Sequence, residues 1–279
     1  MTDIDFHCNE KDNFGHGYSV RAFSYTDYSI PLHSHDFYEI NIILSGVGSH
    51  CIENCQFKVS IGDVYIIPPN VAHAYCDTEN LEVYHILLKQ DFVNSNREES
   101  NSVAGFLKLM EIEPFLRSNF EKSLFVNLSP TQMRIMKSDI AIIDDFGSYG
   151  WSTHHALKYH TVWKILYWLS GILNEQSNEL KIRNKYEFQI LKSLEFIHSN
   201  YHEKITVDLL CKKAFLSRST FLRYFEKMSG VSPVEYLNRY RCQKALELLE
   251  NSNSSKTEIA HLCGFYDLSH MNKTIKSLK

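Results

Sequence analysis

Short apolar and alternating segments, separated by turn residues, dominate residues 1–100 of the chain. Segments of four to eight residues with this pattern are typical of β-strands. Turn residues lie between them, at Ser45-Gly46, Gly62-Asp63 and Pro68-Pro69-Asn70. Closely spaced strands of this kind predict a β-barrel or jelly roll over residues 1–100. The expected strands are Ser19–Tyr25, Phe37–Leu44, Gly48–Ile52, Gln56–Ile61, Val64–Ile67 and Leu81–Leu88.

After residue 100 the apolar positions recur at helical rather than strand spacing. Ser129–Gln132 is a capping box with proline at the first helical position, which predicts a helix ending near Phe146. A second helix is expected around Val162–Leu173, where apolar residues recur three, four and seven positions apart. Residues 101–175 are therefore predicted to pack on the barrel and also to form a homodimer face. The aromatic residues that widen the apolar face are Trp163, Tyr167 and Trp168.

Residues 206–279 contain the same small helical pattern twice. Apolar positions coincide when the chain is shifted by 50 residues, and so do the N-cap residues Ser217 and Asp267. The pattern of each copy predicts a short helix, a tight turn and a second helix, which is the plan of a helix-turn-helix unit. A longer helix, Pro233–Leu249, is expected to join the copies. The coincident apolar pairs are Leu209 and Ile259, Leu210 and Ala260, Phe215 and Phe265, Phe221 and Met271, and Phe225 and Ile275.

Charge divides the chain near the same place. The net charge of −4 combines an excess of eight negative charges before Tyr186 with an excess of four positive charges from Tyr186 onward. A basic C-terminal region suits DNA binding restricted to one end of the molecule. The polar residues 176–186 are expected to be a linker, which leaves 187–279 as the DNA-binding domain.

The cysteines and the apolar segments indicate a cytoplasmic protein. All seven cysteines are expected to be free thiols in a reducing compartment, because no CxxC pair is present. The N-terminus is polar and does not resemble a signal peptide. The longest apolar segment, Trp163–Leu173, is too short to span a bilayer, so no membrane partner is expected.

The residues that carry a family resemblance in the C-terminal region are Leu210, Ala214, Ser217–Phe225, Gly230–Pro233, Tyr236, Leu237, Arg241, Ala245, Leu248, Leu249, Ile259, Ala260, Gly264 and Phe265. With this spacing, residues 206–279 resemble the DNA-binding domain of AraC/XylS-type bacterial transcription regulators. The resemblance implies that two recognition helices bind double-stranded promoter DNA, with RNA polymerase as a further partner. The family's pattern continues past Lys279 with another turn and a final helix, so the C-terminal end is expected to be truncated.

His33-Ser34-His35, Glu39 and Gly46, followed by Gly62-Asp63, Pro68 and His73, resemble the two motifs of the cupin superfamily. In AraC-type regulators such a barrel often precedes the helix-turn-helix domain and binds the effector. The resemblance therefore implies an α+β chain, with a cupin-like β-barrel and following helices, then an all-α double helix-turn-helix domain. In cupin enzymes the matching histidines and glutamate hold a metal, and this set of side chains suits a divalent transition metal.

In the barrel, His33, His35, Glu39 and His73 are expected to converge at one end, because residues two and four apart on a strand share a face. Buried together, these groups need polar partners. With Tyr38 they are the candidate effector-binding residues, and the first four are alternatively metal ligands. The spread of such barrels among carbohydrate regulators implies a sugar-like effector.

On the recognition helices, the residues outside the apolar face are the candidates for DNA contact. Arg223 is expected to read a base, because arginine bridges O6 and N7 of guanine. Arg241, in the connecting helix, is expected to form an ion pair within the domain. The other candidates are Arg218, Ser219 and Thr220 in the first copy, and Ser269, Asn272, Lys273 and Lys276 in the second.

The favoured interpretation is a sequence-specific, dimeric transcription regulator controlled by a small molecule in the barrel, and not an enzyme. The first alternative is a metal-dependent cupin enzyme or a metal sensor fused to a DNA-binding domain, with a divalent metal as the only cofactor. The second is a constitutive DNA-binding protein whose barrel has a purely structural role.

Overall fold

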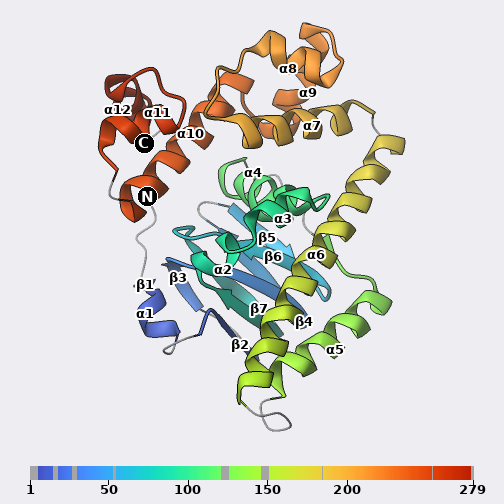
Figure 1. Cartoon of the computed structure of the whole chain (residues 1–279). Helices are drawn as coiled ribbons and strands as arrows, with labels where there is room; N and C mark the ends of the chain where they lie inside the picture. Colours follow the sequence, from blue (N-terminus) through green and yellow to red (C-terminus); the bar gives the residue numbers. More distant parts are fainter. Residues whose placement is uncertain are drawn as a thin grey trace. The chain divides into compact units, whose positions relative to one another are not determined.

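The computed structural model of the chain comprises two compact units, the N-terminal unit Met1–Glu175 and the C-terminal unit Gln176–Lys279 (Figure 1). The structure describes all residues except 1–5, 15–17, 27–29, 53–54, 121–125, 146–150, 184, 253 and 278–279. Within these described ranges, no helix is both long and apolar enough to cross a membrane.

Among the described residues, eight strands form the sheet of the N-terminal unit, in the order β1-β3-β7-β4-β6-β8, with β2 paired to β7 and β5 paired to β4. The central pair, β4 and β7, is antiparallel and extends from Tyr38 opposite Leu88 to Ile52 opposite His73. The strands are β1 Phe6–Cys8, β2 Val20–Thr26, β3 Ile30–His35, β4 Tyr38–Ile52, β5 Cys55–Val59, β6 Asp63–Ile67, β7 His73–Leu88 and β8 Val126–Asn127.

The two central strands are longer than the sequence pattern predicts. Strand β4 continues through Gly46, where Ser45-Gly46 predicted a turn, and β7 already begins at His73. The register between them shifts at Ser45, and β7 contains Asp77 and Asn80 with left-handed φ angles of 52° and 49°. A Cβ atom on Gly46 would approach the carbonyl oxygen of Asn80 to 2.1 Å. The turn-forming residues therefore bend a continuous antiparallel pair instead of ending it.

Helices pack against one face of this sheet (Figure 1). The predicted capping box is confirmed, because Ser129 Oγ accepts from the Gln132 amide and the Gln132 side chain accepts from the Ser129 amide. The predicted helix end, Phe146, lies outside the described residues, and α5 ends at Asp144. The helical segments are α1 Glu10–Asn13, α2 Gln90–Asn94, α3 Arg97–Ser102, the π-helix η1 Lys108–Ile112, α4 Glu113–Phe120, α5 Pro130–Asp144 and α6 Trp151–Arg183.

The apolar face of α6 is buried inside its own unit. Trp163 is 5% exposed, and Ile165, Leu166 and Leu169 are 0% exposed. These side chains form one cluster with sheet residues such as Ile40 and Ile86. They therefore fill the domain core and are not available as the predicted dimer face. Helix α6 also continues through residues 176–183, so this part of the segment predicted as a linker is helical.

The C-terminal unit contains two helix-turn-helix pairs joined by a long helix, as predicted. Helices α8 and α9 form the first pair, α11 and α12 the second, and α10 joins them. Helix α7 packs on both α8 and α9. The bounds are α7 Lys185–Asn200, α8 Val207–Ala214, α9 Arg218–Ser229, α10 Pro233–Asn251, α11 Lys256–Leu262 and α12 Leu268–Ser277.

The two pairs do not share a single shift of 50 residues. The N-cap residues of α8 and α11 are Thr206 and Ser255, which are 49 apart, so the second turn holds one more residue. The predicted pairs Leu209 with Ile259, Leu210 with Ala260 and Phe215 with Phe265 are therefore each wrong by one residue. Exposure agrees, because Phe215 is 87% exposed and Phe265 is 3% exposed. Leu216 is the counterpart of Phe265. The Leu216 amide donates to the Cys211 carbonyl, and the Phe265 amide makes the matching bond to the Ala260 carbonyl.

Candidate functional site

Five ionisable side chains meet on the inner face of the sheet, opposite the face that the helices cover. Strand β3 supplies His33 and His35, β4 supplies Glu39, and β7 supplies His73 and His85. All five are at most 5% exposed. The Glu39 carboxylate lies at the centre: Oε2 is 3.1 Å from Nε2 of both His35 and His73, and Oε1 is 2.5 Å from Nδ1 of His85.

The backbone fixes the proton on three of these imidazole rings. Nδ1 of His33 donates to the Pro31 carbonyl at 3.0 Å, Nδ1 of His35 to the Phe37 carbonyl at 2.7 Å, and Nδ1 of His73 to the Val71 carbonyl at 3.2 Å. A carbonyl oxygen only accepts, so each Nδ1 carries hydrogen, and Nε2 of a neutral ring presents a lone pair.

These lone pairs face another acceptor, the Glu39 carboxylate. An acceptor pair at 3.1 Å needs a proton or a cation between its atoms. Burial and the neighbouring His73 lower the pKa of His33 to about 4, and burial also lowers the pKa of His73. Burial alone would raise the pKa of Glu39, but hydrogen bonding to His35, His73 and His85 holds it well below its usual range. The arrangement thus keeps the carboxylate charged while two of its neighbouring rings resist protonation.

This chemistry fits a divalent transition metal. One ligand atom from each of His33, Glu39 and His73 lies within 4.8 Å of the others. Neutral imidazole nitrogens with a carboxylate are a common ligand set for such metals, and their second nitrogens normally donate to carbonyls, as they do here. His35 has the same Nδ1 bond and reaches the same carboxylate oxygen.

A pocket of about 400 Å³ opens beside this cluster. His33, His35 and Glu39 line one part of it, and Phe23, Tyr25 and Phe37 supply aromatic surface. Phe37 is stacked on the ring of His35 with centroids 4.3 Å apart, and Phe23 is stacked on His85 at 5.1 Å. The aromatic walls are therefore continuous with the polar cluster.

The structure brings together His33, His35, Glu39 and His73, but it places Tyr38 elsewhere. Tyr38 precedes Glu39 on β4, points to the opposite face by strand alternation, and packs against the helix-covered core. Sequence reasoning missed His85, Phe23 and Tyr25. His85 could have been noticed as a histidine within the predicted apolar strand Leu81–Leu88. The sequence could not show that it lies on the same sheet face as Glu39, because this depends on the register of β7 against β4.

The first recognition helix, α9, has one buried and one exposed side. Phe221 and Phe225 are 0% exposed, while Arg218, Ser219 and Arg223 are exposed. Arg223 lies over the ring of Tyr224 at 5.0 Å, and Arg218 forms an ion pair with Asp208 at 2.5 Å. Thr220 is half-buried and receives a hydrogen bond from the N-cap Ser217 hydroxyl, so it belongs to the cap rather than the exposed side.

The second recognition helix, α12, exposes Ser269, Asn272, Lys273 and Lys276, while Met271 is 1% exposed. The structure therefore leaves the predicted DNA candidates of both helices at the surface, Thr220 excepted. Arg241 does not form the predicted ion pair with any residue that the structure describes. Its guanidinium donates to the carbonyls of Tyr201 and Glu203, at 2.8 and 2.7 Å, because these carbonyls just beyond the end of α7 have no helical partner.

Residues 16–123 match the family model described as an AraC-like ligand binding domain, and residues 210–279 match a helix-turn-helix domain. The chain is similar to the HTH-type transcriptional activator RhaS of Klebsiella pneumoniae (strain 342), with 26% identity over 244 residues, 88% of this chain and 82% of the relative. RhaS of Escherichia coli O139:H28 is 26% identical over 243 residues, 87% of this chain and 82% of that one.

Two solved structures are among those to which parts of the chain are similar. The DNA-binding domain of AdpA, solved with a target DNA, is 29% identical, with a TM-score of 0.31 over 32% of this chain and 80% of that one. ToxT from Vibrio cholerae with bound unsaturated fatty acid is 16% identical, with a TM-score of 0.36 over 92% of this chain and 90% of that one. The predicted fold class and family are confirmed: the chain is a DNA-binding transcription regulator of the AraC family with an N-terminal ligand-binding domain.

Proposed function

We propose that the protein regulates transcription in response to a sugar bound in the pocket beside Glu39. The composition of the pocket supports this most directly: Phe23, Tyr25 and Phe37 offer aromatic surface next to buried imidazole and carboxylate groups. A sugar ring has apolar faces that suit aromatic side chains and hydroxyl groups that suit charged partners. The pocket volume of about 400 Å³ lies within the usual range of small-molecule sites. Because the relatives are named transcriptional activators, we propose that the sugar promotes transcription.

A thermal-shift screen of the full-length protein tests this proposal. Neutral monosaccharides and disaccharides form the test set, and an unsaturated fatty acid represents a contrasting ligand class. A ligand at a hundred times its Kd stabilises the native protein by about 2.7 kcal/mol, which raises Tm by several degrees. Phe23→Ala should abolish the shift, whereas Tyr38→Phe, on the opposite face of β4, should retain it. No shift with any sugar, or a shift with the fatty acid alone, would reject a sugar effector.

A bound divalent metal is the second candidate function, favoured by the three Nδ1-to-carbonyl bonds that direct Nε2 lone pairs toward Glu39. His33, His35, Glu39 and His73 would hold the ion. A divalent cation there would neutralise the carboxylate and offer a Lewis-acid site for ligand hydroxyl groups.

Metal analysis of protein purified without chelator tests the second candidate. Wild type should carry about one equivalent of a transition metal per chain, and His73→Ala should carry almost none. His202→Ala, an exposed histidine of the C-terminal unit, is the matched control. Wild-type protein that carries no more metal than His73→Ala would exclude a resident ion.

The DNA contacts are proposed for the exposed sides of α9 and α12. Arg223 has the length and fork geometry to bridge a guanine, and Asn272 has the amide needed for an adenine. Arg218, Ser219, Ser269 and Lys273 are suited to phosphates at the helix starts or to base edges. Acting on promoters, the protein would work in the cytoplasm, with RNA polymerase as its partner in activation, and it would not be an enzyme.

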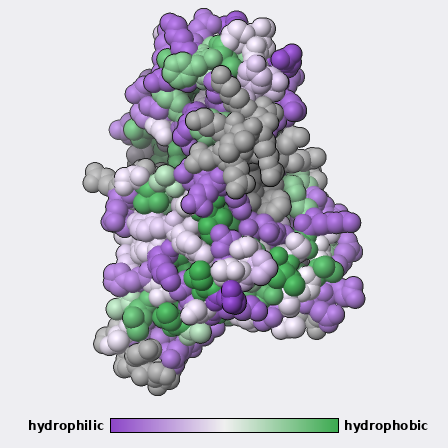
Figure 2. Space-filling model, turned by 90° about the vertical axis from the view of Figure 1, so that its right-hand side faces the viewer, coloured by the Kyte–Doolittle hydropathy of each residue, from purple (hydrophilic) through white to green (hydrophobic). Residues whose placement is uncertain are grey.

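A homodimer is proposed through α5 and the neighbouring part of α6. On this surface Ile135, Ile142 and Leu157 are 43%, 38% and 36% exposed. They offer an apolar contact surface, whereas the residues around Trp163–Leu173 that predicted the dimer are largely buried. Figure 2 shows this side of the molecule, with apolar side chains in small groups among polar ones. Such a mixed surface suits a reversible rather than an obligate interface.

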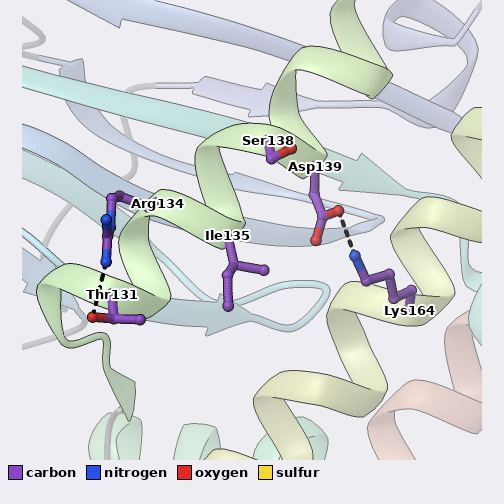
Figure 3. A pocket seen from close by; sticks show the side chains of 6 residues that line it. All are labelled: Thr131, Arg134, Ile135, Ser138, Asp139 and Lys164. Carbon is purple, nitrogen blue, oxygen red and sulfur yellow. Dashed lines mark hydrogen bonds and ion pairs between the residues drawn. The ribbon is translucent and has the colours of Figure 1, made fainter.

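A pocket of about 330 Å³ lies between these helices (Figure 3). Helix α6 supplies Lys164 to the lining of this pocket. Helix α5 supplies the other lining residues, Thr131, Arg134, Ile135, Ser138 and Asp139. Asp139 is 2% exposed and pairs with Lys164 at 2.6 Å. A two-fold axis through this pocket would place Ile135 of each subunit against α5 of the other, since an isologous interface uses the same surface patch on both subunits.

A further inference from the structure

Two aromatic side chains of the C-terminal unit are almost fully exposed. Phe215 is 87% exposed and Tyr266 is 85% exposed, whereas the next large apolar side chain among the described residues, Ile61, is 57% exposed. A single exposed apolar residue is ordinary on a protein surface. Two nearly bare aromatic rings in the corresponding turns of two repeated units call for an explanation.

The backbone at Phe215 provides the second observation. Phe215 has φ 54° and ψ 41°, a left-handed conformation in which a bulky residue is an outlier. Its amide bonds to the Lys212 carbonyl, as the amide of Gly264 bonds to His261 in the second turn. Gly264 therefore occupies the equivalent left-handed position, with φ +76°. Glycine meets the needs of this turn, so the aromatic ring of Phe215 serves something other than the fold.

Both rings lie beside the start of a recognition helix. Phe215 comes two residues before Ser217, the N-cap of α9. Tyr266 comes immediately before Asp267, whose carboxylate accepts from the His270 amide at the start of α12. Two residues of chain span at most about 7 Å. Helix-turn-helix units place the first turn of the recognition helix against base edges and phosphates, so a duplex passes close to both rings.

The charges around Phe215 favour DNA over a protein partner. Lys212 and Lys213 occupy the last turn of α8, and Arg218, which pairs with Asp208, follows Phe215 by three residues. The two lysines and the arginine are exposed and outnumber this one carboxylate. An exposed aromatic ring among cations fits a sugar-phosphate backbone, which offers an apolar deoxyribose between phosphates. Tyr266 adds a phenol, a group that commonly donates to phosphate oxygens.

We propose that Phe215 packs on a deoxyribose of the DNA backbone and that the Tyr266 hydroxyl donates to a phosphate, so that each ring sets the position of the recognition helix that follows it. This rests on the helix-turn-helix assignment and not on the nature of the effector. Backbone contacts carry no sequence information, so both rings act equally on specific and non-specific DNA. The Phe215 contact releases no counterion, and the salt dependence of binding is therefore independent of it.

Fluorescence anisotropy with a labelled 30-base-pair duplex of random sequence tests the proposal without knowledge of the operator. Phe215→Gly reproduces the second turn, and Phe215→Asn keeps a side chain that tolerates the left-handed conformation. Both should bind about three- to tenfold more weakly, the size expected for burying part of one aromatic ring. Tm should stay the same or rise, because the disfavoured backbone conformation is relieved. Tyr266→Phe should also weaken binding, by removing the hydroxyl alone.

Lys212→Met is the matched control for charge. Loss of a phosphate-neutralising lysine should reduce the slope of log Kd against log salt by about one, whereas Phe215→Gly should leave the slope unchanged. Unchanged affinity of the Phe215 and Tyr266 variants at every salt concentration would overturn the proposal. Unchanged affinity combined with lost promoter activation would also overturn it, and would assign the rings to a protein partner such as RNA polymerase.

Discussion

The buried guanidinium of Arg117 ties α4 to strand β6, and its replacement by methionine should destabilise the N-terminal unit strongly. Arg117 is 1% exposed. Its Nε donates to Glu113 Oε1 at 2.8 Å, and its Nη2 donates to Glu113 Oε2 at 3.1 Å and to the Ile66 carbonyl at 2.5 Å. It also lies 5.3 Å from the ring of Tyr65 on the inner face of the sheet.

The expected magnitude follows from the group that is left behind. Glu113 is 3% exposed, and Arg117→Met removes the guanidinium that donates to both of its carboxylate oxygens. Breaking one side of a buried ion pair costs about 3–5 kcal/mol. For a domain of this size, each kcal/mol lowers Tm by about 2–4 °C, so Tm should fall by roughly 10 °C. The double replacement Arg117→Met with Glu113→Leu removes both charges and should recover most of the loss.

Urea unfolding followed by tryptophan fluorescence measures this effect in the full-length protein. All three tryptophans, Trp151, Trp163 and Trp168, belong to the N-terminal unit, so the signal reports that unit alone. Lys58→Met, at an exposed lysine of β5 outside the proposed dimer interface, should change the free energy of unfolding by less than about 0.5 kcal/mol. The reasoning is refuted if Arg117→Met is as stable as Lys58→Met, or if the double variant is no more stable than Arg117→Met.

Two further predictions concern DNA reading and assembly. Arg223→Ala should weaken binding to the cognate promoter by about 1–3 kcal/mol and relax one base position, which footprinting and a base-substitution series of the site will measure. Unchanged affinity and base preference would remove Arg223 from the reading residues. Ile135→Glu combined with Ile142→Glu should shift full-length protein toward the monomer in sedimentation velocity at micromolar concentration, because two charges enter the proposed interface. Ile61→Glu, at an exposed apolar site of the same unit, is the control. A wild type that sediments as a monomer at high concentration would reject the dimer.

Local signals predicted much of the architecture. The capping box at Ser129 fixed the start of α5, and the repeated N-caps Ser217 and Asp267 located both recognition helices. These caps depend on neighbours in the sequence, so a single chain suffices to reveal them. Glu39 was expected on the same strand as His33 and His35, at an even offset. It does join them, but from the separate strand β4, because β3 ends at His35.

Features that depend on distant partners could not be read from the chain. Ser45-Gly46 resembles a turn in the sequence. In the structure β4 pairs with β7 both before and after these two residues, so β4 is continuous. Trp163 and its neighbours suggested an intermolecular face, because only the fold reveals that the sheet already covers them. The second turn holds one more residue than the first, and the sequence pattern alone did not reveal it. The structure did, because Phe215 is exposed whereas Phe265 is buried. His85 and Phe23 join the candidate site through the pairing of β2 and β7, in which they lie directly opposite each other.

The central claim is that a sugar in the pocket beside Glu39 controls binding to promoter DNA. The most direct measurement is the affinity of full-length protein for an operator selected from a random duplex pool, with and without the sugar that gives the largest thermal shift. Wild-type protein should bind about 5- to 150-fold more tightly with the sugar, the usual range of coupling between two sites. His35→Ala should bind with the basal affinity and ignore the sugar. A wild-type affinity that does not change with the sugar, or a His35→Ala response equal to that of wild type, would contradict the account.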